Sequence, residues 1–115
     1  LAAAHSIHNG LSALKETHKY LHGEKVAFGT LAGLHLTDVE PKLIDEVYTF
    51  CYKIGLPITL NEIGLSNVTM EDLLKVAAKT CAPGESIYHE VGEITPEKVL
   101  SALIVADKVG RKYHN

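Results

Sequence analysis

The segment from Gly23 to Leu36 constrains the fold of this chain most, because its apolar residues leave no polar face. A helix that is apolar on all sides must be buried on all sides. Two glycines four residues apart, Gly29 and Gly33, would allow another helix to approach this one closely. We therefore predict a central helix over 23–36 with other helices packed around it. We expect His35 to lie at the edge of the core.

The chain on either side of this segment carries helix signals and no convincing strand. Leu1 to about Asn9 has helical composition, and Asn9-Gly10 predicts its end. Residues 11–21 predict a turn or short irregular helix with a solvated His18. Pro41 opens the next helix and Gly55-Leu56-Pro57 ends it. Apolar residues at spacings of three and four predict its buried face, namely Leu43, Val47, Phe50 or Cys51, and Ile54.

Three further helices are predicted by capping residues. Thr59-x-x-Glu62 resembles a capping box for a short helix ending near Gly64. Thr69 caps a helix that Pro83-Gly84 ends, and Thr95 precedes the last one. In that last helix Asp107 is predicted to face solvent. Residues 85–94, with Tyr88, His89 and Glu90, predict a solvated loop. The sum is an all-α fold, a bundle or array of five to six helices.

Length and composition exclude several classes of protein. A chain of 115 residues fits one domain, and its 11 Lys and Arg are scattered and outnumbered by 14 Asp and Glu, so no nucleic-acid partner is expected. No run reaches the roughly 18 to 20 apolar residues of a membrane span. Cys51 and Cys81 form no Cys-x-x-Cys pair and predict reduced core thiols. We expect a cytoplasmic protein with no membrane partner.

The first residues predict that the chain continues a longer one. Position 1 is Leu rather than Met, and the helical composition begins without a capping Ser, Thr, Asp or Asn. We therefore expect the C-terminal portion of a larger enzyme.

Three histidines are the candidate functional residues. His5 and His8 are three residues apart and would share one face of a helix, while His22 stands at the start of the central helix. Two helices that each present an imidazole can hold part of a metal site, although a catalytic zinc usually takes three protein ligands. On spacing alone a His-x-x-His pair is a weak metal signal, and histidines at the edge of the core remain the alternative. Glu24 and Lys25 are predicted to be first-turn charges rather than catalytic groups.

Two strings around these histidines carry a family resemblance. Ala-Ala-Ala-His5-Ser-Ile-His8-Asn-Gly-Leu and His22-Gly-Glu-Lys-Val-Ala-Phe-Gly-Thr-Leu resemble the glycerol dehydrogenases of the iron-containing, dehydroquinate-synthase-like alcohol dehydrogenase superfamily. The similarity continues through 55–60 and 103–107, and so covers essentially the whole chain. It implies the α domain of that superfamily over residues 1–115, a C-terminal metal-binding helical domain whose N-terminal NAD-binding domain is absent from this chain.

The resemblance also implies roles for the three histidines. His5 and His22 correspond to metal ligands, for Zn²⁺ or Fe²⁺. His8 would lie beside the site as a catalytic group that orients the substrate or relays a proton. The family's third ligand, an aspartate, and its NAD site precede this segment. The implied activity is oxidation of glycerol or a similar small polyol by the complete enzyme, with this segment alone inactive, and the implied partners are the N-terminal domain and further copies in a homo-oligomer.

Two alternatives remain open from the sequence. One is a helical interaction module without catalysis, which fits the missing cofactor domain and the presence of two predicted ligands where three are needed. The other is a related metal-dependent alcohol dehydrogenase that acts on a different substrate.

Overall fold

The chain folds into five α-helices and two short 3-10 helices in the computed structural model, which describes residues 2–37, 39–82 and 94–114. No strand occurs in these ranges, so the predicted all-α class is confirmed. The elements in chain order are α1 (Ala2–Leu11), η1 (Lys15–Thr17), α2 (His22–Leu34), α3 (Pro41–Ile54), η2 (Asn61–Ile63), α4 (Met70–Thr80) and α5 (Pro96–Tyr113).

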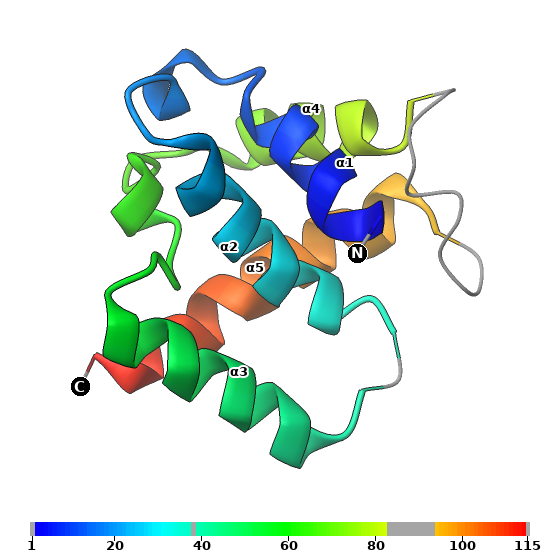
Figure 1. Cartoon of the computed structure of the whole chain (residues 1–115). Coiled ribbons are helices and arrows are strands. Elements are labelled where there is room, and N and C mark those ends of the chain that lie inside the picture. Colours follow the sequence, from blue (N-terminus) through cyan, green and yellow to red (C-terminus); the bar gives the residue numbers. More distant parts are fainter. Residues whose placement is uncertain (1, 38, 83–93, 115) are drawn as a thin grey trace.

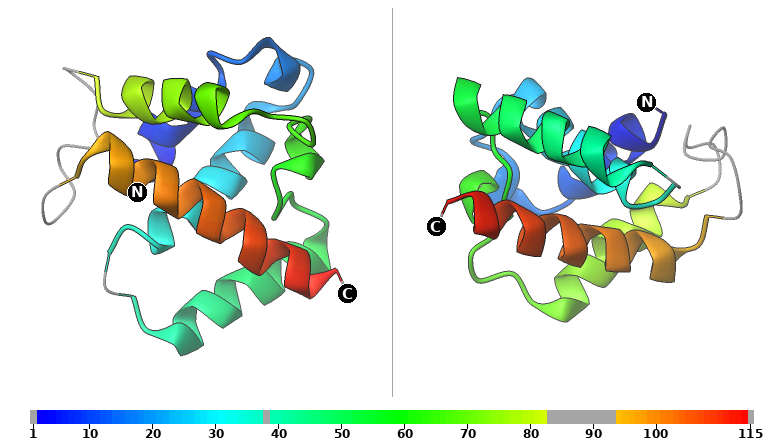
Figure 2. Two further views of the ribbon diagram at one scale, coloured as in Figure 1. Left: turned by 180° about the vertical axis from the view of Figure 1, so that it is seen from behind. Right: turned by 90° about the horizontal axis from the view of Figure 1, so that it is seen from below.

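The predicted central helix is α2, which begins at His22. It runs through the middle of the molecule, with α1 and α4 on one side, α3 on the other and α5 behind it (Figure 1). The reverse view shows α5 crossing the whole molecule (Figure 2). Phe28 and Leu31 of α2 are completely buried, Phe28 in a core shared with α1, α4 and α5, and Leu31 in a second core shared with α3. One apolar helix therefore supplies both cores.

Gly10 allows a close contact between two helices and lies inside α1 rather than at its end. The predicted stop at Asn9-Gly10 is wrong, because α1 continues to Leu11. A Cβ atom on Gly10 would lie 2.5 Å from Thr80 Oγ1 and 2.6 Å from the Val76 carbonyl oxygen of α4. Gly10 thus allows α1 to pack against α4 and does not end the helix.

The predicted caps are confirmed. Thr69 Oγ1 accepts a hydrogen bond from Asp72 N–H at 3.1 Å, and Thr95 Oγ1 accepts one from Lys98 N–H at 3.3 Å. Gly55 ends α3 with a φ of +81°, the left-handed conformation that glycine adopts without a steric cost. The predicted stop at Pro83-Gly84 and all of the predicted 85–94 loop except Ile94 lie outside the described residues.

The buried face of α3 differs in part from the prediction. Cys51 is buried and Val47 packs half-buried against the second core, as predicted, while the completely buried Tyr48 was not predicted. Leu43, Phe50 and Ile54 were predicted to be buried, but they are 49, 59 and 56% exposed. The helix carries apolar residues over more of its surface than α2 and α5 cover, and its sequence pattern does not indicate which part they contact. The three exposed residues, Leu43, Phe50 and Ile54, are called the α3 stripe below.

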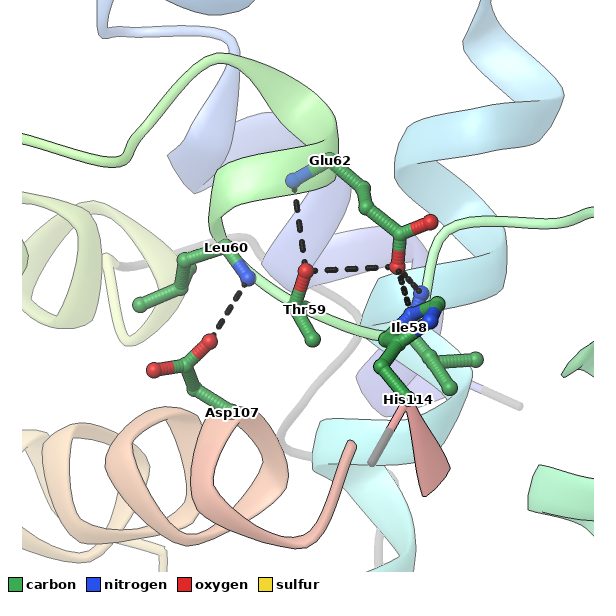
Figure 3. A network of polar contacts seen from close by, with 6 residues as sticks. All are labelled: Ile58, Thr59, Leu60, Glu62, Asp107 and His114. Atoms are coloured by element: carbon green, nitrogen blue, oxygen red, sulfur yellow. Dashed lines mark hydrogen bonds and ion pairs between the residues drawn. The ribbon is translucent and has the colours of Figure 1, made fainter. Parts of the chain in front are cut away.

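A polar network attaches the 58–64 segment to α5 (Figure 3). The Thr59–Glu62 pair occurs as predicted, since Glu62 N–H donates to Thr59 Oγ1 at 3.3 Å and Thr59 Oγ1 donates to the Glu62 carboxylate at 3.2 Å. It supports a 3-10 turn that ends at Gly64 with a φ of +87°. The prediction that Asp107 faces solvent is wrong. Asp107 is half-buried, and its carboxylate accepts a hydrogen bond from Leu60 N–H at 2.9 Å.

The predicted core thiols are confirmed, since Cys51 and Cys81 are both buried and form no disulfide with each other. None of the described helices is both long enough and apolar enough to cross a membrane.

We predict that Gly110→Ala destabilises the fold strongly. A Cβ atom at this position would overlap the carbonyl oxygen of Ile58, a backbone atom that cannot move aside cheaply. We expect the free energy of unfolding in urea to fall by about 3 kcal/mol. Gly23→Ala is the matched control, because nothing lies within 4 Å of its added Cβ atom and its stability should be unchanged or slightly higher. Equal stability of the two variants would contradict this account of α5 packing.

Candidate metal centre

The contact between α1 and α2 brings the three predicted histidines together. The ring centroids of His8 and His22 are 4.1 Å apart, with their planes at 64°. The rings of His5 and His8 follow one another along α1, with centroids 6.4 Å apart. His8 therefore contacts the first residue of α2 and also lies one turn from His5.

The hydrogen bonds of the three rings differ. His8 is half-buried and both of its ring nitrogens are engaged, with Nδ1 3.3 Å from Asn9 Oδ1 and Nε2 3.5 Å from Ser12 Oγ. His5 and His22 are exposed, and within the described residues their ring nitrogens make no hydrogen bond. The nitrogens that remain available for a metal ion are thus those of His5 and His22.

The surroundings of His8 favour its neutral form. Burial lowers the pKa of His8 below the ordinary value, and the neighbouring His22 lowers it further when protonated. The contact with Asn9 acts in the opposite direction, and Lys25 and His5 add smaller decreases to the pKa. A neutral imidazole keeps one nitrogen as an acceptor, which is the form that can take a proton or accept a hydrogen bond.

The burial of Lys25 and its contact with Ser12 were not identified from the sequence. Lys25 was predicted to be a first-turn charge, and in the structure it is only 7% exposed, with its Nζ donating to Ser12 Oγ at 3.1 Å. The burial of Lys25 could have been suspected from its position within a helix whose other residues are mostly apolar. Glu24 does behave as a first-turn charge, since its carboxylate accepts a hydrogen bond from Leu21 N–H at 2.8 Å.

The donor set fits part of a metal site. Imidazole nitrogen is a ligand for zinc and for iron, and a catalytic zinc usually has three protein ligands and one open position. The described residues contain no group of three His, Cys, Asp or Glu side chains that could hold a metal ion together. His5 and His22 would therefore bind a metal ion only together with further ligands.

Two further histidines, His18 and His35, lie where they were predicted, at the surface and at the edge of the core. His18 is exposed and its Nε2 donates to the Ser12 carbonyl oxygen at 2.7 Å. His35 lies at the edge of the second core, where its Nε2 donates to the Tyr48 hydroxyl at 3.0 Å.

An open groove elsewhere on the surface is not lined by any of the three candidate histidines. It lies beside the network of Figure 3, between the 59–73 region and the end of α5. Some of its charged groups are paired, since Asp107 lies 3.3 Å from Arg111 and Glu62 lies 3.0 Å from His114. Lys108 and Lys112 also line it.

Comparison with known proteins shows a specific likeness. No family model matches the chain. It is 57% identical to the glycerol dehydrogenase of Thermotoga maritima over 115 residues, all of this chain and 32% of that protein. It is 46% identical over 112 residues to the glycolaldehyde reductase of Halobacterium salinarum, 97% of this chain and 31% of that protein. The crystal structure of glycerol dehydrogenase from Schizosaccharomyces pombe superposes with a TM-score of 0.93 at 41% identity, over 98% of this chain and 29% of that one.

These matches define the extent of the likeness. The chain spans about a third of the length of the curated relatives it matches. The histidine strings and the helices that carry them belong to the shared third.

We predict that His8 titrates below the ordinary histidine pKa of about 6.5 in the metal-free protein. Burial is the main cause, so His22→Ala should move the pKa of His8 upward without restoring the ordinary value. Proton and nitrogen NMR spectra recorded across the titration would measure this. His114→Ala, which removes a histidine bonded to Glu62, is the control and should leave His8 unchanged. An ordinary or raised pKa for His8 would contradict the geometry.

Proposed function

We propose, since this chain belongs to the glycerol dehydrogenase family, that it forms the C-terminal helical domain of a metal-dependent, NAD-linked enzyme that oxidises glycerol to dihydroxyacetone. The observation that carries the proposal is the 57% identity to a glycerol dehydrogenase along the whole chain. An N-terminal domain of that enzyme would bind NAD and supply an aspartate as the third metal ligand. On this proposal the 115-residue segment alone is inactive and the complete enzyme is cytoplasmic.

His5 and His22 would hold the metal ion, Zn²⁺ or Fe²⁺, as neutral imidazoles. Their support is the exposure of both rings and the absence of hydrogen bonds to their nitrogens among the described residues. A divalent cation bound there would supply Lewis acidity that lowers the pKa of a glycerol hydroxyl. Because His22 is the first residue of α2, the positive end of that helix dipole also favours negative charge on the substrate oxygen.

His8 would be the catalytic group of this domain. Its ring lies against His22, so a hydroxyl group next to the metal ligands is within its reach. In the neutral form the ring would orient the glycerol hydroxyl or relay its proton, and NAD bound by the N-terminal domain would be the hydride acceptor. This role agrees with the hydrogen bonds to Asn9 and Ser12, which orient the ring.

A second candidate is an enzyme of the same type with a different substrate. The likeness to a glycolaldehyde reductase, at 46% identity over 97% of the chain, supports a different small hydroxy compound as the substrate. The likeness to two oxidoreductases favours either enzyme over a helical interaction module without catalysis.

We further propose that the complete enzyme is a homo-oligomer with no nucleic-acid or membrane partner. The α3 stripe supports this, because it exposes Leu43, Phe50 and Ile54 along one helix. It belongs to the helix on the side of α2 away from α1, so a domain that completes the histidine site would leave it uncovered (Figure 1). A second copy of the chain is the occupant that we propose.

We predict that His5→Ala and His22→Ala, made in the complete enzyme, each remove the metal ion and the activity together. Loss of one of three protein ligands should reduce the metal content after dialysis to a small fraction of one ion per chain. Elemental analysis by mass spectrometry and the rate of NADH formation with glycerol would measure both effects. His8→Ala should keep the metal and lower kcat by about a hundredfold. His114→Ala is the control, and a stoichiometric metal ion in either ligand variant would overturn the assignment.

We predict that Phe50→Ser combined with Ile54→Ser lowers the molar mass of the complete enzyme in solution. The two substitutions remove exposed apolar surface that a second copy would bury. Light scattering coupled to size-exclusion chromatography would measure the mass. Val105→Ser is the matched control, because that residue is 38% exposed on α5. An unchanged mass in the double variant would contradict the proposed use of the α3 stripe.

A further inference from the structure

Lys25 is a buried cation without a carboxylate partner among the described residues. It is 7% exposed, and its Nζ donates to the Ser12 hydroxyl at 3.1 Å. The ion pairs in the described part of the chain involve other residues, namely Asp72–Lys75, Asp107–Arg111 and Glu62–His114. Burying an ammonium group against one neutral hydroxyl is unfavourable for folding. A packing role would be filled at lower cost by an apolar side chain of the same length.

The hydrogen bond from Lys25 determines what Ser12 does. An ammonium group has donors only, so Ser12 Oγ accepts and keeps its own hydrogen to donate. One acceptor within reach is His8 Nε2, at 3.5 Å. Ser12 directly follows α1, where a serine hydroxyl can also donate to the carbonyl four residues earlier, here that of His8. A lysine fixed on the serine oxygen restrains the hydroxyl from that rotation.

The same logic then determines the tautomer of His8. A ring nitrogen that accepts from Ser12 carries no hydrogen, so the hydrogen of the neutral ring lies on Nδ1. Nδ1 is 3.3 Å from Asn9 Oδ1, which is an acceptor. Each residue in this chain therefore donates a hydrogen bond to the next, from Lys25 through Ser12 and His8 to Asn9.

We propose that Lys25 is a positioning residue that acts through Ser12 to hold His8 as its Nδ1–H tautomer, with the ring fixed against His22. The functional part of this inference rests on the proposed function, since His8 is taken as the group beside the substrate. Lys25 itself touches neither the substrate nor the metal ion in this account.

The tautomer can be tested without activity. The probe is metal-free protein with ¹⁵N-labelled histidine at about pH 8, where histidine is neutral. Two-bond proton–nitrogen correlations distinguish the two tautomers, and His8→Ala assigns the His8 signals. We expect Nδ1–H in the unaltered protein and a mixture of tautomers in Lys25→Met, which keeps the length of the side chain but not its charge. Ser12→Ala should give the same mixture, and Lys79→Met, an exposed lysine of α4, should leave Nδ1–H. An Nε2–H form in the unaltered protein, or Nδ1–H retained in Lys25→Met, would overturn the inference.

Kinetics of the complete enzyme separate positioning from simple packing. Lys25→Met should lower kcat for glycerol about tenfold with an unchanged metal content. Because the effect passes through His8, the same substitution should cause no further loss in a His8→Ala background. An equal loss of kcat in both backgrounds would show a structural role and overturn the positioning role. If the unaltered complete enzyme does not oxidise glycerol, the proposed function fails, whereas the NMR result still decides the tautomer.

Discussion

The close approach of α1 to α2 is the contact on which the candidate site depends. A Cβ atom on Gly29 would lie 2.8 Å from the Ala4 carbonyl oxygen, so this distance between the helices is open only to glycine. His8 meets His22 because the two backbones lie this close. Gly10 allows the same on the α4 side of α1. Glycines in two helices thus set the helix separations on both sides of α1, the helix that carries His8.

Polar contacts add to the apolar packing of the second core. Tyr48 is completely buried, and its hydroxyl donates to the Ala106 carbonyl oxygen at 3.1 Å while it accepts from His35. Burial raises the pKa of Tyr48, so the hydroxyl keeps its hydrogen and remains a donor. Its ring stacks on Tyr113 with centroids 5.3 Å apart. These contacts join α3 to α5 and leave the histidine site on the other side of α2 structurally separate from them.

Local signals predicted the elements well, because each depends on only a few neighbouring residues. Thr69 and Thr95 cap their helices and Gly55 ends α3, as expected from residue type and spacing. The errors arose where tertiary contacts decide the outcome. Glycine is a residue type that commonly ends helices, but Gly10 lies inside α1, where it packs against α4. On α3 the apolar pattern is wider than the buried face, so Phe50 lies exposed beside the buried Cys51.

The site shows the same division between local and tertiary information. The spacing of His5 and His8 places both on one helix face, and it gives no reason to assign them different roles. The difference in their hydrogen bonds comes from neighbours along the chain, because Asn9 and Ser12 engage the nitrogens of His8, while those of His5 have no partner in the described chain. Lys25 is the strongest case, since charge alone predicts solvent exposure. A buried charge becomes interpretable only when its partner is known, and here that partner also contacts His8.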